Sequence, residues 1–254
     1  MCTTCGCGDA PHSHDHEHTH DQGVRRTLSV GEDLLAANNA HAAHNRRRLA
    51  RTEIFALNLM SGPGAGKTTL LEQTIRLLDA RLPVAVIEGD QQTSRDAERI
   101  LATGAPAIQI NTGTGCHLDA HRVGHAIEDL APAPRSLLFI ENVGNLVCPA
   151  AFDLGEARKA VILSVTEGED KPLKYPHMLI AAQLLLISKI DLLPYVSFDA
   201  NACIAYAKQV NPALEVLRVS AHSGEGMEAW LAWLTRHLAN GHEAAGVSTY
   251  GPCN

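Results

Sequence analysis

A glycine-rich segment that ends in Lys67 and Thr68 carries the strongest chemical signal in the chain. Gly62, Gly64 and Gly66 alternate with other residues between an apolar run and the expected first turn of a helix. Glycines let the backbone turn tightly, so that successive N–H groups and the positive end of the helix face one anion. A lysine here reaches the β- and γ-phosphates of a nucleotide, and the next hydroxyl binds the bridging magnesium ion. The segment predicts a phosphate-binding loop.

This loop departs from the usual pattern G-x-x-x-x-G-K-[ST] at its first position, where Ser61 replaces glycine. The strand expected before it and the helix expected after it are intact, which favours nucleotide binding over an accidental glycine-rich turn. The residues expected to hold the phosphates are Gly62, Gly64, Ala65, Gly66, Lys67, Thr68 and Thr69.

Two carboxylates follow other expected strands. Asp90 ends one apolar run, and Glu141 ends another that continues into Gly144. At the carboxyl edge of a parallel sheet, both would stand beside the phosphates, where they would contact magnesium directly or through water. Gly144 is expected to donate its backbone N–H to the γ-phosphate. The predicted catalytic set is Lys67, Thr68, Asp90 and Glu141.

The segment from Ser188 to Asp191 indicates which base is bound. A carboxylate accepts two hydrogen bonds from the N1–H and N2–H₂ edge of guanine, whereas adenine has no such donor pair. The usual pattern is N-K-x-D; Ser188 replaces the asparagine, while Lys189 and Asp191 are retained. Ala221 lies in a segment similar to the S-A-K segment whose backbone contacts the guanine oxygen. The expected nucleotide is GTP rather than ATP.

Two further segments place sulfur and nitrogen ligands near the nucleotide. Cys116 and His117 are expected at the start of the helix after the strand at 107–110, and Cys148 follows the Glu141 loop. Two thiols and an imidazole suit a soft or borderline metal ion. Packing as buried cysteines is the alternative, but both segments are polar and belong to the nucleotide face. Cys203, among apolar residues of an expected helix, is assigned to packing.

The N-terminus contains Cys2, Cys5 and Cys7 with almost no apolar residue beside them. Their spacing lets three thiolates close around one ion, with the α-amino group as a fourth ligand. Three sulfurs and one nitrogen suit tetrahedral zinc or planar nickel. An unstructured, oxidation-prone tail is the alternative.

A histidine tract follows this cysteine cluster. Its alternating histidines cannot build a core, and imidazoles favour nickel, copper and zinc, so we interpret the tract as a reservoir of several ions. An expression tag is the alternative, but tags are usually contiguous. The expected ligands are His12, His14, His16, His18 and His20.

The pattern of apolar residues predicts the elements that position these groups. Ser29 and Glu32 have the spacing of a capping box, which predicts a helix of about five turns over 29–49. His41 and His44 lie three apart on it and are interpreted as a solvated pair rather than a metal site. Continuous apolar runs indicate strands buried on both faces, hence a mostly parallel sheet flanked by helices. Strands are predicted before the phosphate loop and at 84–88, 107–110, 137–141, 161–165, 184–187 and 216–219.

This α/β fold of the P-loop NTPase class would follow a flexible metal-binding tail. The expected organisation is a tail over 1–22, a linker helix over 23–51, a GTPase domain over 52–240 and a C-terminal tail over 241–254.

Composition limits the class of protein and its partners. The chain has 254 residues and a formal net charge of -7, which suits one main domain and argues against a nucleic-acid or anionic-membrane partner. No apolar run approaches the roughly 20 residues of a membrane span, and the start has no apolar signal core. We therefore expect a cytoplasmic protein. Three of its seven cysteines lie in the first seven residues, which favours thiolate metal chemistry over disulfides.

Together these segments resemble the HypB family, the nickel-incorporation GTPases of hydrogenase maturation. The resemblance covers nearly the whole chain and includes the C-x-x-C-x-C start, the histidine-rich insert, SGPGAGKTT, GDQQT, TGTGCHLD, ENVGNLVCPA, SKIDLLPY and SAHSGEGM. GCHLD with ENVGNLVCPA is distinctive; the C-P-H triplet of the urease-maturation GTPase and the G-C-x-C-C motif of zinc and cobalamin GTPases are absent from the sequence.

The resemblance implies a GTP-driven metallochaperone that delivers nickel to the hydrogenase large subunit. It also implies a zinc-containing accessory protein as partner and a GTP-dependent homodimer. The expected cofactors are GTP, Mg²⁺, Ni²⁺ and Zn²⁺. A nickel storage protein with a vestigial GTPase domain is one alternative, and a signalling GTPase with adventitious cysteines is another.

Overall fold

The computed structural model describes residues 20–79, 81–90 and 94–246. Outside these residues lie the expected tail ligands Cys2, Cys5, Cys7, His12, His14, His16 and His18. His20 is the first residue of helix α1. Contacts divide the chain into two units, Met1–Ala36 and Ala37–Asn254, and α1 crosses this boundary. The sheet and the sites below belong to the second unit.

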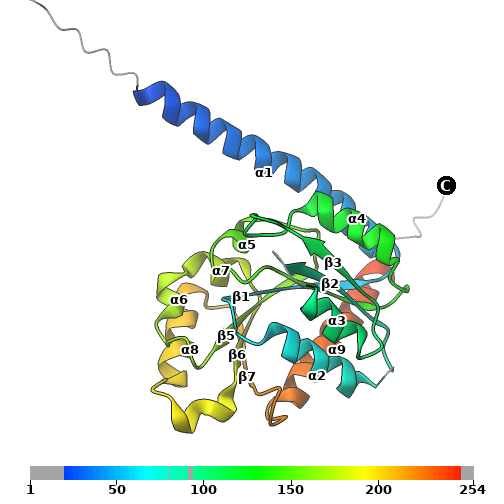
Figure 1. Ribbon diagram of the computed structural model, residues 1–254, viewed down its shortest axis with the longest axis vertical. Helices are drawn as coiled ribbons and strands as arrows, with labels where there is room; N and C mark the ends of the chain where they lie inside the picture. Colours follow the sequence, from blue (N-terminus) through cyan, green and yellow to red (C-terminus); the bar gives the residue numbers. More distant parts are fainter. Residues whose placement is uncertain (1–19, 80, 91–93, 247–254) are drawn as a thin grey trace, which may run out of the picture. The chain divides into compact units, whose positions relative to one another are not determined.

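Seven parallel strands form one sheet in the order β3-β2-β4-β1-β5-β6-β7 (Figure 1). The predicted parallel fold and each predicted strand are confirmed, with small shifts at the strand ends. The strands are β1 Phe55–Ser61, β2 Val84–Asp90, β3 Ala107–Asn111, β4 Leu137–Glu141, β5 Arg158–Ser164, β6 Leu184–Ser188 and β7 Glu215–Val219.

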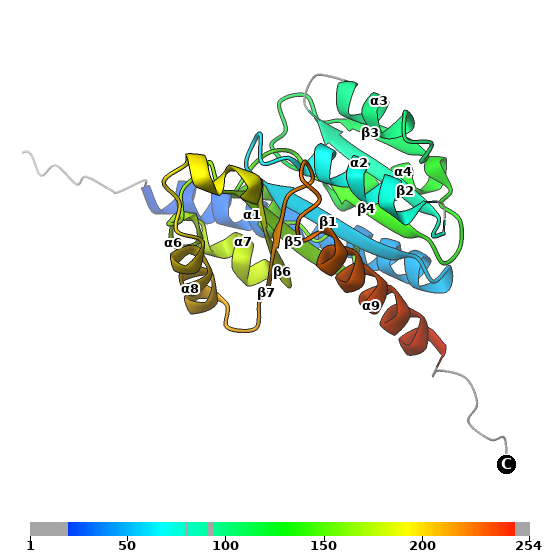
Figure 2. The ribbon, with the colours of Figure 1, turned by 90° about the horizontal axis from the view of Figure 1, so that it is seen from below.

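Helices cover both faces of the sheet because its strands alternate apolar side chains toward each face. Leu57 and Leu59 of β1 pack with α2, α3 and α9, whereas Ala56 packs with α4 and the end of α1. Helices α7 and α8 pack on strands β5 and β6, on the side away from α9 (Figure 2). The helices are α1 His20–Arg51, α2 Lys67–Leu78, α3 Arg95–Leu101, α4 Ala120–Leu130, α5 Cys148–Ala151, α6 Lys171–Lys174, α7 Pro176–Ala181, η1 Ile190–Tyr195, α8 Ala200–Val210 and α9 Met227–Gly246.

Two helix starts differ from prediction. Helix α1 begins at His20, so Ser29 lies inside it and is not its cap; the segment before Ser29 contains no proline and has enough helix-forming residues to continue the helix. Helix α4 begins at Ala120, where the Asp119 side chain accepts a hydrogen bond of 2.9 Å from the Arg122 backbone N–H. Cys116 and His117 therefore precede the helix and lie in a loop.

Buried asparagines fasten the second half of α1 to the loops that carry the cysteines. Asn45 Nδ2 donates to the backbone oxygens of Ala120, at 2.7 Å, and Leu154, at 3.0 Å. Asn38 accepts from Ala120 N and donates to Asp153 O, both at 2.8 Å. Because these bonds are buried or partly buried, they fix the start of α4 and the segment after α5 against one helix. None of the described helices is long and apolar enough to cross a membrane.

Candidate functional site

The phosphate loop follows β1, the central strand, and runs directly into α2. Gly64 and Gly66 have φ values of 73° and 94°, a backbone conformation that glycine adopts without the penalty of a side chain. Gly144 lies against the same loop, since a Cβ built there would come within 3.1 Å of Pro63 Cα. The strand, the turn and the helix start are thus those that the glycine spacing predicted.

Lys67 and Thr68, the first residues of α2, face the end of β4. The ammonium group of Lys67 donates to Ser61 Oγ at 2.9 Å and lies 4.0 Å from Glu141 Oε1. The Thr68 hydroxyl donates to the same Glu141 oxygen at 2.9 Å. Ser61, which replaces the usual first glycine, thus holds the phosphate-loop lysine. Sequence reasoning treated Ser61 as a departure from the pattern and missed this contact.

Glu88 is a second buried carboxyl group that sequence reasoning did not single out. It stands opposite Glu141 in the parallel pairing of β2 with β4 and is 2% exposed. Burial, together with the charge of Glu141, raises the pKa of Glu88 to about 11. Burial also raises the pKa of Glu141, while Lys67, Glu88 and Thr68 oppose that rise. Burial therefore favours the protonated form of Glu88 at neutral pH, and in that form its carboxyl group can donate a hydrogen bond.

Asp90 also ends β2, as predicted, and its backbone oxygen accepts from Thr112 N at 2.9 Å. This bond joins the end of β2 to the loop that leads to Cys116. The hydrogen bonds and the ion pair described above bring Lys67, Thr68 and Glu141 together. The role of Asp90 in magnesium binding stays a prediction.

Replacing Glu88 with glutamine should change how stability depends on pH. In the unfolded chain Glu88 ionises near its ordinary pKa of about 4.3, whereas in the folded protein it keeps its proton up to about 11. The parent therefore loses stability as pH rises between these values, by at most about 1.4 kcal/mol per pH unit. Glutamine keeps a donor for Glu141 and does not titrate. The free energy of unfolding of Glu88→Gln, relative to that of the parent, should therefore increase as the pH rises from 5 to 9.

Urea unfolding at a series of pH values would measure this difference. The control is Glu225→Gln, because Glu225 is exposed, and its difference from the parent should stay nearly constant. A constant difference for Glu88→Gln would show that Glu88 is ionised in the folded protein.

A cavity of about 180 Å³ opens beside the phosphate loop and is lined by the residues predicted to bind the base, among them Lys189, Asp191 and Ala221. Lys189 Nζ donates to Gly64 O at 2.6 Å, so its stem runs along the loop. Asp191 Oδ1 accepts from the Ser220 hydroxyl at 2.5 Å. Ser188, where asparagine is usual, donates to Ala65 O at 2.8 Å. This hydrogen bond thus still joins the segment Ser188–Asp191 to the phosphate loop.

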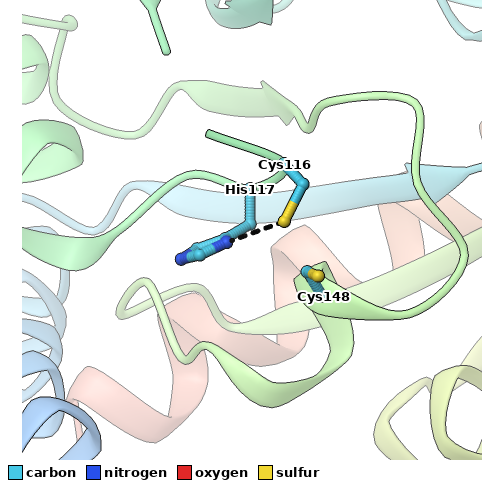
Figure 3. Close-up of side chains that lie close together, drawn as sticks. All are labelled: Cys116, His117 and Cys148. Atoms are coloured by element: carbon cyan, nitrogen blue, oxygen red, sulfur yellow. Dashed lines mark hydrogen bonds between the residues drawn. The ribbon is translucent and has the colours of Figure 1, made fainter. Parts of the chain in front are cut away.

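Cys116, His117 and Cys148 come together although the cysteines lie on different loops. Their ligand atoms all lie within 4.8 Å of one another, and Cys116 Sγ is 3.6 Å from His117 Nδ1 (Figure 3). The His117 ring stacks on Phe152, with 3.8 Å between ring centroids. All three candidate ligands are partly exposed, so an ion can reach them from solvent. Two sulfurs and one imidazole nitrogen form an open three-ligand set for zinc or nickel.

The surroundings of this cluster shift the pKa values of Cys148 and His117. The neighbouring thiol of Cys116, and then burial, raise the pKa of Cys148. Burial lowers the pKa of His117, which keeps the imidazole neutral and able to bind a metal. A divalent cation would offset the repulsion between two thiolates, so binding would release protons. Cys203, in contrast, is fully buried in the core, which confirms its assignment to packing.

Asn142 connects the phosphate site with the cysteine cluster, and sequence reasoning missed it. It follows Glu141 directly, and its Oδ1 accepts from the backbone N–H of Leu118, the residue after His117, at 3.2 Å. On the other side of the cluster, Asn145 Oδ1 accepts from Cys148 N at 3.3 Å. Both loops that carry the cysteines are therefore held by residues of the segment that starts at Glu141.

A parallel sheet with a phosphate loop after its central strand, and with carboxyl groups at the neighbouring strand ends, defines a P-loop nucleotide-binding protein of the GTPase type. Residues 56–218 match the family model described as CobW/HypB/UreG, nucleotide-binding domain. The hydrogenase maturation factor HypB of Azotobacter vinelandii is 65% identical over 211 residues, which are 83% of this chain and 70% of that protein. That of Escherichia coli K12 is 60% identical over 210 residues, covering 83% and 72%.

Solved structures show the same relationship. HypB from Archaeoglobus fulgidus has a TM-score of 0.76 at 38% identity, covering 80% of this chain and 100% of that one. HypB from Helicobacter pylori, solved in complex with nickel, has a TM-score of 0.75 at 35% identity, covering 85% and 100%. The chain belongs to the HypB family of hydrogenase maturation factors, which confirms the resemblance seen in the sequence.

Proposed function

We propose that this protein is a GTP-hydrolysing nickel metallochaperone that inserts nickel into the hydrogenase large subunit during maturation. The observation that carries the proposal is the direct connection between the nucleotide site and the cysteine cluster. Glu141 contacts Thr68 at 2.9 Å, and the next residue, Asn142, holds Leu118 beside His117. A displacement of the Glu141 segment when the γ-phosphate leaves would therefore reach both metal-bearing loops.

The nucleotide would be held at its two ends. Lys67, the glycine-loop N–H groups and the start of α2 would bind the phosphates, while Asp191 and Lys189 would bind guanine in the cavity beside them. Thr68 and the buried Glu141 form a hard-oxygen pair that suits magnesium, with Asp90 as a further candidate. Magnesium would neutralise charge on the β- and γ-phosphates. Lys67 is 8% exposed, and it would stabilise the charge that grows on the departing phosphate.

Nickel would be the cargo rather than a resident cofactor. Cys116, His117 and Cys148 would bind it while GTP is present, with zinc as the competing ion at the same ligands. Nickel binding by a family member supports this choice of ion, since HypB from Helicobacter pylori was crystallised in complex with nickel. Because three protein ligands leave a position open, a ligand from a second copy or from the client would complete the site.

The partners of such a metallochaperone would be the hydrogenase large subunit and a zinc-containing accessory protein, and the loaded state would be a GTP-dependent homodimer. The cysteines and histidines before α1 would supply ions to the inner site, which is the site formed by Cys116, His117 and Cys148. A storage protein would also bind ions there, but it would not need GTP turnover to release them.

Metal affinity should depend on the bound nucleotide. The test uses the full-length chain with Cys2, Cys5 and Cys7 replaced by alanine, so that these thiolates do not mask the inner site. Nickel and zinc affinities would be measured, through thiolate charge-transfer absorption, with GDP and with a non-hydrolysable GTP analogue. A ratio on the order of 5–150-fold between the two states is expected, as for typical coupling between sites.

When Cys148→Ala is added to that chain, the metal affinity should become the same with GDP and with the GTP analogue, because the site loses one of its ligands. Equal affinities in the two nucleotide states, or a ratio that survives Cys148→Ala, would contradict a metal-release role for hydrolysis.

A further inference from the structure

An amide and a carboxylate are buried side by side in the core, and neither belongs to the nucleotide site or to the cysteine cluster. Asn58 of β1 is fully buried, and Glu156, which lies between α5 and β5, is 6% exposed. Asn58 Nδ2 donates to Glu156 Oε1 at 3.2 Å. Burying polar groups costs free energy unless hydrogen bonds replace their contacts with water. The other partners of these two side chains therefore show what the pair holds in place.

On one side, Asn58 holds the segment that starts at Glu141. Its Oδ1 accepts from Asn142 Nδ2 at 3.3 Å. The other end of the same Asn142 amide, Oδ1, accepts from Leu118 N at 3.2 Å. Asn58 therefore fixes the amide that joins the end of β4 to the loop of His117.

On the other side, Glu156 is connected to the end of α5, the helix that carries Cys148. Glu156 Oε1 lies 3.4 Å from the ammonium group of Lys159. That group donates to the backbone oxygens of Phe152, at 2.8 Å, and Ala150, at 3.4 Å. Because the last carbonyl groups of a helix have no partners within it, Lys159 fixes how α5 ends.

These contacts act on two of the three candidate metal ligands. Cys148 is the first residue of α5. Phe152, whose carbonyl group Lys159 binds, stacks on the His117 ring. A displacement of Lys159 would therefore move Cys148 and His117 relative to Cys116. Since a metal ion requires its ligands at narrowly defined distances, such a movement would change metal affinity.

We propose that Asn58, Glu156 and Lys159 are positioning residues of the cysteine cluster, and that they transmit a change at the end of β4 to α5. With Asn142 they form a polar relay, a continuous chain of contacts between these two elements. Coupling between sites is carried by hydrogen-bond networks of this kind. The relay rests on the proposed function, because it requires metal affinity to depend on the bound nucleotide. The competing explanation is that these contacts only stabilise the fold.

Exchanging the hydrogen-bonding roles of Asn58 and Glu156 separates the two explanations. Glu156 accepts from Asn58 and from Leu154 N. Glu156→Gln offers a single acceptor oxygen for both, and Asn58→Asp replaces the donor with a second carboxylate. In the double variant Asn58→Asp/Glu156→Gln, the new amide donates to the new carboxylate, so the contact and the net charge are both retained. The carboxylate also keeps an acceptor for Asn142 Nδ2.

Each variant would be made in the full-length chain in which Cys2, Cys5 and Cys7 are replaced by alanine. Ni²⁺ affinity would be measured through thiolate charge-transfer absorption, with GDP and with the non-hydrolysable GTP analogue. The expected 5–150-fold ratio between the two states should fall to about one in each single variant and should return in the double variant. Glu225→Gln, at an exposed position, is the control and should keep the parental ratio.

Lys159→Met tests the relay at its other end. The Lys159 side chain is partly exposed, and the substitution keeps its apolar stem and leaves the hydrogen bond between Asn58 and Glu156 in place. Its ratio should also fall to about one, and circular dichroism would establish that the protein is folded. A parental ratio in folded Lys159→Met, or a double variant no better than the single ones, would overturn the relay alone. Equal affinities in the two states of the parent would contradict the proposed function and the relay with it.

Discussion

Replacing Lys67 with alanine is expected to lower GTP turnover by roughly a hundred- to a thousandfold, the effect of removing one buried group that stabilises transition-state charge. Lys67 is 8% exposed, so its charge acts in an environment with little water to screen it. Its Nζ also lies 4.0 Å from Glu141 Oε1. Alanine would therefore remove a phosphate ligand and leave Glu141 without its nearest positive charge.

Steady-state phosphate release by Lys67→Ala and by the parent would measure this loss. Lys208→Ala is the matched control, because Lys208 is exposed on α8, and its turnover should equal that of the parent. Nickel bound by the N-terminal thiolates should be unaffected in both variants. Near-parental turnover of Lys67→Ala would exclude the assigned role of this lysine.

Replacing Asp191 with asparagine should change which base the protein prefers. The loss of a charged hydrogen-bond pair to guanine should weaken GTP binding by about 1–3 kcal/mol, which is about 5- to 150-fold. The amide complements xanthine, so xanthosine triphosphate should bind better than it does to the parent. Asparagine keeps the Oδ1 acceptor that Ser220 contacts at 2.5 Å, so the cavity should keep its shape.

Competition between GTP, ATP and xanthosine triphosphate would measure the switch in the variant and the parent. Ser220→Ala is the informative control: it removes the anchor of Asp191 but leaves the carboxylate, so GTP should bind more weakly without any gain for xanthosine triphosphate. If ATP competed as well as GTP for the parent, Asp191 would not be reading guanine.

The sequence by itself predicted the strands and the phosphate loop correctly because each is encoded locally. Continuous apolar runs predict strands buried on both faces, and a glycine loop between a strand and a helix predicts an anion site wherever it occurs. The predicted start of α1 at Ser29 was wrong, because a capping-box spacing can also occur in the interior of a helix, and this helix begins at His20.

Only the tertiary structure decided which distant groups meet. Glu88 stands beside Glu141 because β2 pairs with β4 in one particular register, and a shift by one residue would have turned Glu88 to the other face. His41 meets His121 because α1 packs against α4, a contact that no local spacing contains. Local sequence patterns identified the reactive residue types. Strand register and helix packing determined which residues lie beside them, because burial and charge pairing depend on segments far apart in the chain.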